Sequence, residues 1–254
     1  MSITYGERFF AWETVTAHRS AQFMLPIVMD QVHPRSVLDV GCGQGAWLAV
    51  WAELGVTEFL GLDGSHVHLK KLAIPRHSFR AVDLANSWHV NQRFDLVESL
   101  EVAEHLPATN GPEFVRCLCT YSDIVLFSAA QPGQGGVHHV NERDASYWAE
   151  LFSEQGYAPF DCIRPLIARN RAIDPWYRFN SIIYANVVGE ARLSPHARDS
   201  RVSNLSALDQ YRSDIPWRLR RSILRLLPRA AVTFLSRLRY KLVLALLDTT
   251  MRSR

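Results

Sequence analysis

The sequence predicts a doubly wound α/β fold, with a mostly parallel sheet of seven strands and a C-terminal helical extension. Short apolar segments rich in β-branched residues alternate with segments of helical periodicity between Ser36 and Gly156, a pattern typical of parallel sheets covered by helices. A glycine-rich turn follows the first apolar segment. The last two apolar segments predict an antiparallel finish to the sheet.

The individual elements follow from periodicity and from the residues that stop it. The predicted strands are Ser36–Val40, Glu58–Asp63, Phe79–Val82, Phe94–Glu98, Asp123–Ser128, Pro159–Ile163 and Asn180–Val188. Helices are predicted over 7–32, Gly45–Leu54, His66–Leu72, 111–120 and Asp144–Gln155. Pro34 and Gly55 end the first two helices, because proline breaks a helix and glycine favours its C-terminal cap. Asp144 is a candidate N-terminal cap.

The C-terminal quarter differs in composition from the rest. Residues 189–215 are rich in Ser, Arg, Asp and Asn and are expected to form a linker. Apolar clusters then alternate with arginines from Ile215 to Met251, including Leu242–Leu247, and Pro228 is expected to divide this stretch into two helices. We therefore divide the chain into a ligand-binding domain, residues 1–190, and a linker with a basic amphipathic tail, residues 191–254.

Composition excludes several classes of protein. Hydrophobic residues make up 48% of the 254 residues, which is incompatible with a disordered or fibrous chain. There is no signal-like N-terminus and no run of roughly 18 apolar residues, so we expect a cytoplasmic protein. The four cysteines are too few for a disulfide framework and are expected to be buried free thiols.

Charge is distributed unevenly along the chain. From Pro195 onward there are 13 Lys and Arg against 4 Asp and Glu, which leaves 15 basic and 21 acidic residues before it. The acidic body argues against nucleic acid in the main cleft. The basic tail suits peripheral contact with an acidic membrane surface, but it could equally pack on its own domain or on a second subunit in a homodimer.

The glycine-rich turn predicts a ligand crevice at the carboxyl edge of the sheet. Gly41, Gly43 and Gly45 directly follow the first strand in VLDVGCGQGAWL. Without a β-carbon, the backbone can turn tightly there and approach a ligand. The signal is ambiguous alone, because Gly41, Gly43 and Ala46 also satisfy the dinucleotide pattern G-x-G-x-x-[GA].

Acidic residues at three strand ends resolve that ambiguity. Asp39 can reach a positively charged ligand, whereas it would repel a dinucleotide pyrophosphate. Asp63 suits paired ribose hydroxyls, which a dinucleotide and a positively charged nucleoside cofactor both carry. Asp83 can accept from an adenine amino group while Leu84 packs on the ring. A nucleotide-dependent oxidoreductase is thereby disfavoured.

This constellation resembles the class I S-adenosylmethionine-dependent methyltransferases from about Tyr5 to about Val188. FDLVESLEVAEHLP is similar to the fourth-strand motif of small-molecule members, which implies that Glu98 to Leu100 pass the methionine end of the cofactor. The stretch FSAAQPGQGGVHHVNERDASYWAELF resembles a bacterial branch found near sugar and glycolipid biosynthesis. The residues expected to bind S-adenosylmethionine are Asp39, Gly41, Gly43, Gln44, Asp63, Gly64, Asp83, Leu84 and Glu98.

Methyl transfer to a hydroxyl needs alignment and a group that removes a proton. His139 lies in the glycine-rich segment Gln134–Glu142 and is the expected general base, with His105 as its competitor; His138 is expected to be exposed. Glu142 and Glu104 could orient the imidazole or help bind a divalent metal such as magnesium. The segment itself could fold over a substrate as a lid.

The acceptor is less constrained than the cofactor. The resemblance implies O-methylation of a small sugar-like molecule or of a saccharide or glycolipid precursor, on which Trp176 and Tyr177 could stack if they do not belong to the core. A small molecule methylated on nitrogen or carbon, and a non-catalytic binding protein of this fold, remain alternatives. We find no Asn/Asp-Pro-Pro-Tyr/Phe signature of base methylation in nucleic acid.

Overall fold

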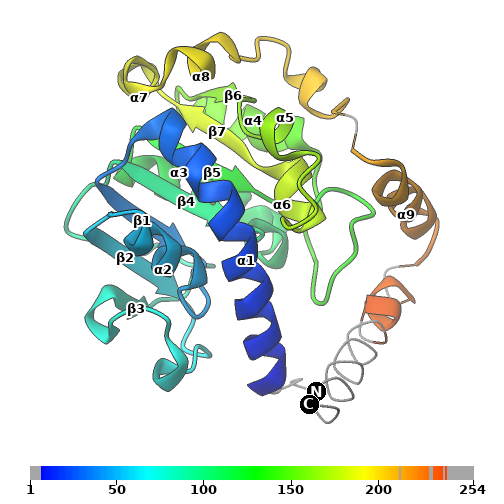
Figure 1. Ribbon diagram of the computed structural model, residues 1–254. Coiled ribbons are helices and arrows are strands. Elements are labelled where there is room, and N and C mark those ends of the chain that lie inside the picture. The colour runs from blue at the N-terminus through cyan, green and yellow to red at the C-terminus, as the bar shows by residue number, and fades with distance from the viewer. Residues whose placement is uncertain (1–6, 212, 229–230, 237, 239–254) are drawn as a thin grey trace.

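The computed structural model describes residues 7–211, 213–228, 231–236 and 238, and Figure 1 shows one twisted sheet with helices on both faces. Its strands are β1 (Ser36–Val40), β2 (Glu58–Asp63), β3 (Phe79–Ala81), β4 (Leu96–Leu100), β5 (Ile124–Ser128), β6 (Ala158–Phe160) and β7 (Ile182–Ala185). Their order is β3-β2-β1-β4-β5-β7-β6. All neighbouring pairs among β1 to β5 are parallel, and β7 runs antiparallel to both β5 and β6. The predicted fold class is confirmed.

Two hydrophobic cores cover the two faces of the sheet. Helices α1 (Glu7–Val32) and α2 (Ala46–Glu53) pack on one face, where side chains such as Val37 of β1 point. Helices α3 (Gly111–Tyr121) and α4 (Ala145–Glu154) pack on the other, against Leu38 and Val40. Successive strand residues face opposite sides, so one buried strand supplies both cores.

Some connections differ from their predicted form. The segment His66–Leu72 forms only a 3₁₀ turn, η1 (Leu69–Lys71), where two adjacent lysines leave little apolar surface to bury. The final strands pair antiparallel as predicted, but α5 (Arg164–Ile167) and α6 (Pro175–Asn180) lie between them. The connections also contain the 3₁₀ turns η2 (Arg76–Ser78), η3 (Ala103–His105) and η4 (Ala108–Asn110).

The segment expected to be a linker is folded onto the domain. It contains α7 (Val187–Arg192), α8 (Pro195–Asp199) and η5 (Leu205–Leu208). Leu193 and Ala197 join one core and Leu208 joins the other. These few apolar side chains, spaced among polar residues, are enough to anchor the segment, although its composition resembles that of a linker. The division at residue 190 stays a prediction.

The tail begins with α9 (Ile215–Arg225), and residues 231–236 are again helical after Pro228. This agrees with the predicted separation of two helices at the proline. The apolar cluster Leu242–Leu247 lies outside the described residues. Among the described residues, none of the helices combines the length and the hydrophobicity that a membrane-spanning segment needs.

Candidate active site

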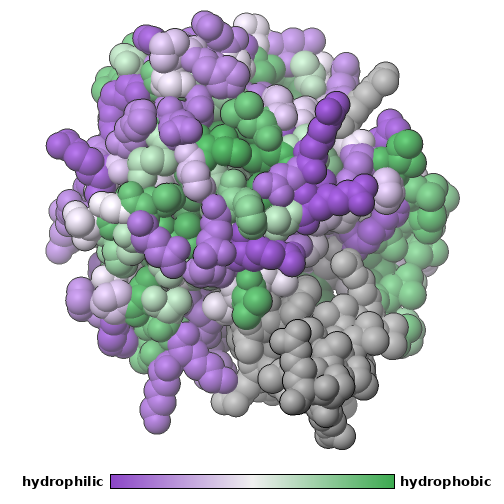
Figure 2. Space-filling view, viewed as in Figure 1, coloured by the Kyte–Doolittle hydropathy of each residue, from purple (hydrophilic) through white to green (hydrophobic). Residues whose placement is uncertain are grey.

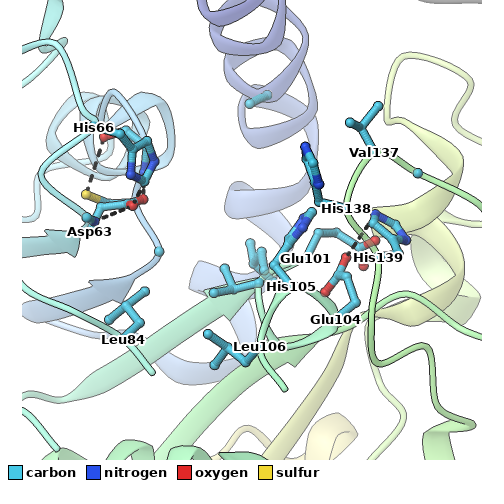
Figure 3. A pocket seen from close by; sticks show the side chains of 18 of the residues that line it. Asp63, His66, Leu84, Glu101, Glu104, His105, Leu106, Val137, His138 and His139 are labelled. Carbon is cyan, nitrogen blue, oxygen red and sulfur yellow. Dashed lines mark hydrogen bonds and ion pairs between the residues drawn. The ribbon is translucent and has the colours of Figure 1, made fainter. Parts of the chain in front are cut away.

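A cavity of about 990 Å³ opens at the carboxyl edge of the parallel strands, at the upper end of the usual range for ligand pockets. Its walls come from the segments that follow β1 to β5, from α1 and α6, and from two residues of the tail. Figure 3 shows Asp63 and His66 on one side of the cavity and Glu101, Glu104 and His139 on the opposite side. The cavity therefore has two chemically different ends.

The glycine turn forms part of the first end. Gly41, Gly43 and Gly45 have positive φ values of 92°, 53° and 80°, a region that side chains rarely tolerate. A β-carbon at Gly41 would also lie 2.2 Å from Cγ2 of Val102, and one at Gly45 would lie 2.8 Å from Cγ1 of Ile74. Glycine is therefore required at Gly41 and Gly45 by both conformation and space.

Asp63 connects the glycine turn to the end of β2. Its Oδ2 accepts from the backbone N–H of Gly43 at 2.7 Å, and its Oδ1 accepts from that of Gly64 at 2.6 Å. Burial raises the pKa of Asp63, and these two hydrogen bonds partly offset that effect. The carboxylate lines the cavity while it holds two of its loops in place.

Three more residues selected from the sequence line the same end. Asp83 and Leu84 follow β3, and Gln44 lies in the glycine turn. The carboxylate of Asp83 accepts from the Ala85 N–H at 3.0 Å and from the Asn86 side-chain amide at 2.7 Å, so it also stabilises its own turn. With its side-chain amide turned so that the nitrogen faces them, Gln44 donates to the carbonyl oxygens of His68 and Lys71, each at 3.1 Å.

Asp39 and Glu98, which the sequence analysis assigned to the cofactor, do not belong to the cavity lining. They are neighbours across β1 and β4, and Trp51 Nε1 donates to Glu98 Oε2 at 3.0 Å. Both side chains point toward α2, because strand residues alternate between faces. Burial raises the pKa of Glu98 to about 8, and burial together with the charges of Glu98 and Asp63 raises that of Asp39 well above its ordinary value.

The raised pKa of Glu98 predicts a pH-dependent stability. The folded protein keeps this proton up to about pH 8, whereas the unfolded chain loses it near the ordinary value of 4.5, so stability should fall as pH rises between them. The side chain of the Glu98→Gln variant is always neutral. The free energy of unfolding of this variant minus that of wild type should therefore increase by roughly 2–4 kcal/mol between pH 5 and pH 8. Urea unfolding of both proteins without ligand measures this, and parallel profiles would contradict it.

Glu101, which the sequence analysis did not select, reaches the cavity instead. It follows the end of β4 with a positive φ of 58°, which turns the chain out of the strand. Its Oε1 accepts from Asn180 Nδ2 at 3.0 Å and its Oε2 from Gln134 Nε2 at 2.5 Å. Asn180 Nδ2 also donates to Gln134 Oε1 at 2.8 Å. Burial raises the pKa of Glu101, and these hydrogen bonds oppose it.

Glu104 belongs to η3, lies close to Glu101 and is fully buried. Among the described residues, neither of its carboxylate oxygens makes a hydrogen bond of ordinary geometry. Burial, and after it the charge of Glu101, raises the pKa of Glu104 well above its ordinary value, while backbone amides of Glu104 and Ala130 offset part of this. A buried carboxylate with so few partners is costly unless a ligand or ion completes it.

His139 approaches Glu104 from the loop between β5 and α4. Its Nε2 lies 4.0 Å from Glu104 Oε1, and its Nδ1 lies 3.0 Å from Glu142 Oε1. Glu142 also accepts from the backbone N–H groups of Gly133 and Gly135, at 2.9 and 2.8 Å. Burial alone would raise the pKa of Glu142, but the hydrogen bond and charge of His139 and these amides lower it. Glu142 therefore fixes both the loop and the imidazole, without lining the cavity itself.

His105 completes this second end of the cavity. Its ring lies edge-on to that of His139, with centroids 4.9 Å apart. Burial by the surrounding protein and then the charge of His139 lower the pKa of His105 to about 4, so the imidazole is neutral near pH 7. Ligand atoms of Glu104, His105 and His139 lie within 4.8 Å of one another and could hold a metal ion. His138 is exposed, as expected, at the cavity wall.

Residues distant in sequence also contribute to the walls. Trp176 and Tyr177 of α6 line the cavity, and Tyr177 packs edge-on against Trp47 at 4.9 Å. Arg220 of α9 lines it as well, so the tail lies close to the second end. Glu101 could have been found by the strand-end rule that selected Asp63, but no local signal points to Arg220.

Comparison with known proteins supports the resemblance to methyltransferases that the sequence shows. The model of the family described as Methyltransferase domain matches residues 13–154, more than half of the chain. A search of the curated proteins found none that matches this chain.

Two solved structures share the fold. An O-methyltransferase family protein from Burkholderia thailandensis has a TM-score of 0.53 at 12% identity, over 72% of this chain and 60% of its own. The sugar N-methyltransferase KedS8 from a Streptoalloteichus species has a TM-score of 0.54 at 13% identity, over 73% and 97%. The chain thus spans less than two thirds of the first of these proteins. Family match and fold agree with the sequence: the chain belongs to the class I S-adenosylmethionine-dependent methyltransferases.

Proposed function

We propose that the protein is an O-methyltransferase that transfers the methyl group of S-adenosylmethionine to a hydroxyl of a small sugar-like molecule or a saccharide or glycolipid precursor. The observation that carries the proposal is the cavity with two ends. One has a glycine turn and the strand-end acids Asp63 and Asp83, and the other has Glu104 and His139. The first suits the cofactor and the second a hydroxyl that must lose a proton.

The cofactor supplies an activated methyl group and its own leaving group, so the protein contributes alignment and proton removal. In this proposal Asp63 accepts hydrogen bonds from the ribose hydroxyls, and Asp83 with Leu84 receives the adenine. The space at Gly43, where a β-carbon would meet no atom within 4 Å, leaves room for the rest of the ligand. Asp39 lies outside the cavity lining, and its burial disfavours the charged form, so it would favour the sulfonium only from a distance and only when ionised.

His139 is the proposed general base. Its Nδ1 faces Glu142 at 3.0 Å, which favours the tautomer with the proton on Nδ1 and leaves the lone pair on Nε2, near the cavity. Glu142 is the positioning residue of this pair, and Trp176, which lines the cavity, would stack on a sugar ring. KedS8 is named as a sugar N-methyltransferase, which supports a sugar-like acceptor without deciding the atom.

A second way to activate the hydroxyl is favoured by Glu104. Its poorly satisfied oxygens, next to Glu101 and two imidazoles, fit a divalent cation held by Glu104, His105 and His139. Two imidazole ligands favour manganese or zinc over magnesium, which the sequence analysis named as one example of a divalent metal. When bound, such a cation makes a hydroxyl easier to ionise. His139 would then be a ligand and could not also be the base.

Transfer of a labelled methyl group to a panel of saccharides and glycolipid precursors, followed by mass spectrometry, tests the proposal. Product methylated on oxygen supports it, and product methylated only on nitrogen or carbon contradicts it. EDTA separates the two modes of activation. The base mode predicts unchanged turnover, whereas the cation mode predicts at least a tenfold loss that manganese restores. Binding of manganese to wild type, but not to Glu104→Gln, provides a readout independent of activity.

A further inference from the structure

Helix α9 has two contrasting faces. Trp217 on its inner face is 5% exposed and packs near Phe179. The outer face carries apolar residues spaced by four, four and three positions, which lie along one side of a helix. They are Ile215, Leu219, Ile223 and Leu226, with exposures of 70%, 60%, 52% and 85%. We call these four residues the outer stripe.

The inner face holds α9 on its own domain. Arg221 and Arg225 donate through Nε to the carbonyl of Pro132, at 3.3 and 2.9 Å. A β-carbon at Gly133 would lie 2.5 Å from the carbonyl oxygen of Arg221, so the backbones of the loop and α9 nearly touch. This loop leads to His139, and Figure 1 shows it reaching toward α9. Because the domain already occupies the inner face, the outer stripe stays exposed.

The helical residues after Pro228 extend this apolar surface. Phe234, Leu235 and Leu238 are 65%, 41% and 44% exposed. Figure 2 shows hydrophobic residues gathered along the right edge of the molecule, where Figure 1 places α9. Apolar side chains this exposed, gathered on one side of the molecule, mark an interaction site.

Charge decides which partner fits. Between Ile215 and Lys241 the sequence holds eight Lys and Arg and no Asp or Glu. Arg218 is exposed and directly precedes Leu219 of the outer stripe. A second copy would bring two strongly positive segments together, and a nucleic acid would meet apolar side chains first. An anionic lipid surface suits both the positive charge and the exposed apolar side chains, because its headgroups attract arginine and its interface accepts the apolar face.

We propose that α9 and the helical residues that follow Pro228 dock on an anionic phospholipid surface, with the outer stripe in the interface. Arg220 and Ser236 line the catalytic cavity, so docking brings the cavity close to the lipid headgroups. If the proposed function holds, the acceptor is then presented at the membrane, as a lipid-linked saccharide would be. The docking surface itself does not depend on the acceptor.

Vesicle flotation of the full chain tests the proposal. Wild type should float with vesicles that contain phosphatidylglycerol, at least tenfold more than with phosphatidylcholine alone, and salt should weaken this binding. Leu219→Ser with Ile223→Ser should lower binding at least tenfold. The matched control is Val187→Ser with Val188→Ser on α7, which changes apolar residues at least as exposed (81% and 61%) outside the tail and should leave binding unchanged.

No flotation of wild type, or equal flotation of the outer-stripe variant, would overturn the proposal. A wild-type dimer in ultracentrifugation that the same variant converts to a monomer, without vesicle binding, would also overturn it and assign the stripe to a second copy. Calorimetric titration with S-adenosylmethionine separates this result from the proposed function. The four exposed substitutions lie outside the first end of the cavity and should leave the affinity for S-adenosylmethionine unchanged.

Discussion

Replacing Asp63 by alanine is expected to weaken S-adenosylmethionine binding about a hundredfold or more. The carboxylate accepts hydrogen bonds from Gly43 and Gly64 and is the proposed acceptor for the ribose hydroxyls. Hydrogen bonds to a charged group contribute about 1.5–3 kcal/mol each, and every 1.4 kcal/mol changes affinity about tenfold. The variant therefore loses both direct contacts and the preorganisation of two cavity loops.

Isothermal titration calorimetry with S-adenosylmethionine and S-adenosylhomocysteine measures this effect. Asp63→Asn keeps the size of the side chain but presents a donor where the cavity needs an acceptor, so it should also bind weakly. Asp30→Ala changes an exposed acid of α1 and is the matched control. Thermal unfolding shows whether each variant is folded. Wild-type affinity in a folded Asp63→Ala protein would remove Asp63 from the cofactor site.

Replacing His139 by alanine is expected to lower turnover by about 10²–10⁴ while cofactor affinity stays nearly unchanged. This range is the usual contribution of a general acid or base. The cofactor affinity is spared because His139 lies at the second end of the cavity, opposite Asp63 (Figure 3). Cofactor binding and chemistry should therefore separate cleanly between the two variants.

Methyl transfer measured at saturating acceptor, with calorimetry on the same protein, tests this separation. His77→Ala removes an exposed histidine of η2 outside the cavity lining and is the control for loss of an imidazole. Full activity of His139→Ala would exclude both its role as base and its role as a metal ligand. The chelator experiment then decides between these two roles in the active wild type.

Much of the fold could be predicted because its signals are local. The β-branched segment before Gly41 and the helical pattern after Gly45 place a turn between them, whatever the rest of the chain does. Asp63 and Asp83 were found by the same logic, since parallel strands end at one edge of the sheet. The 3₁₀ turn at Leu69–Lys71 and the folded segment after Arg192 were missed, because few apolar residues decide them.

The sequence by itself determined the order of the seven strands, the glycine turn and the acids at the first end of the cavity, because each depends on periodicity or on the conformational needs of single residues. Tertiary structure alone decided that Glu98 faces Trp51 while Glu101 enters the cavity. It also brought Glu104 close to His139. It placed α9 against the loop that contains Pro132 and His139. Such contacts depend on strand alternation, a backbone turn and packing between distant segments, which leave no local pattern in the chain.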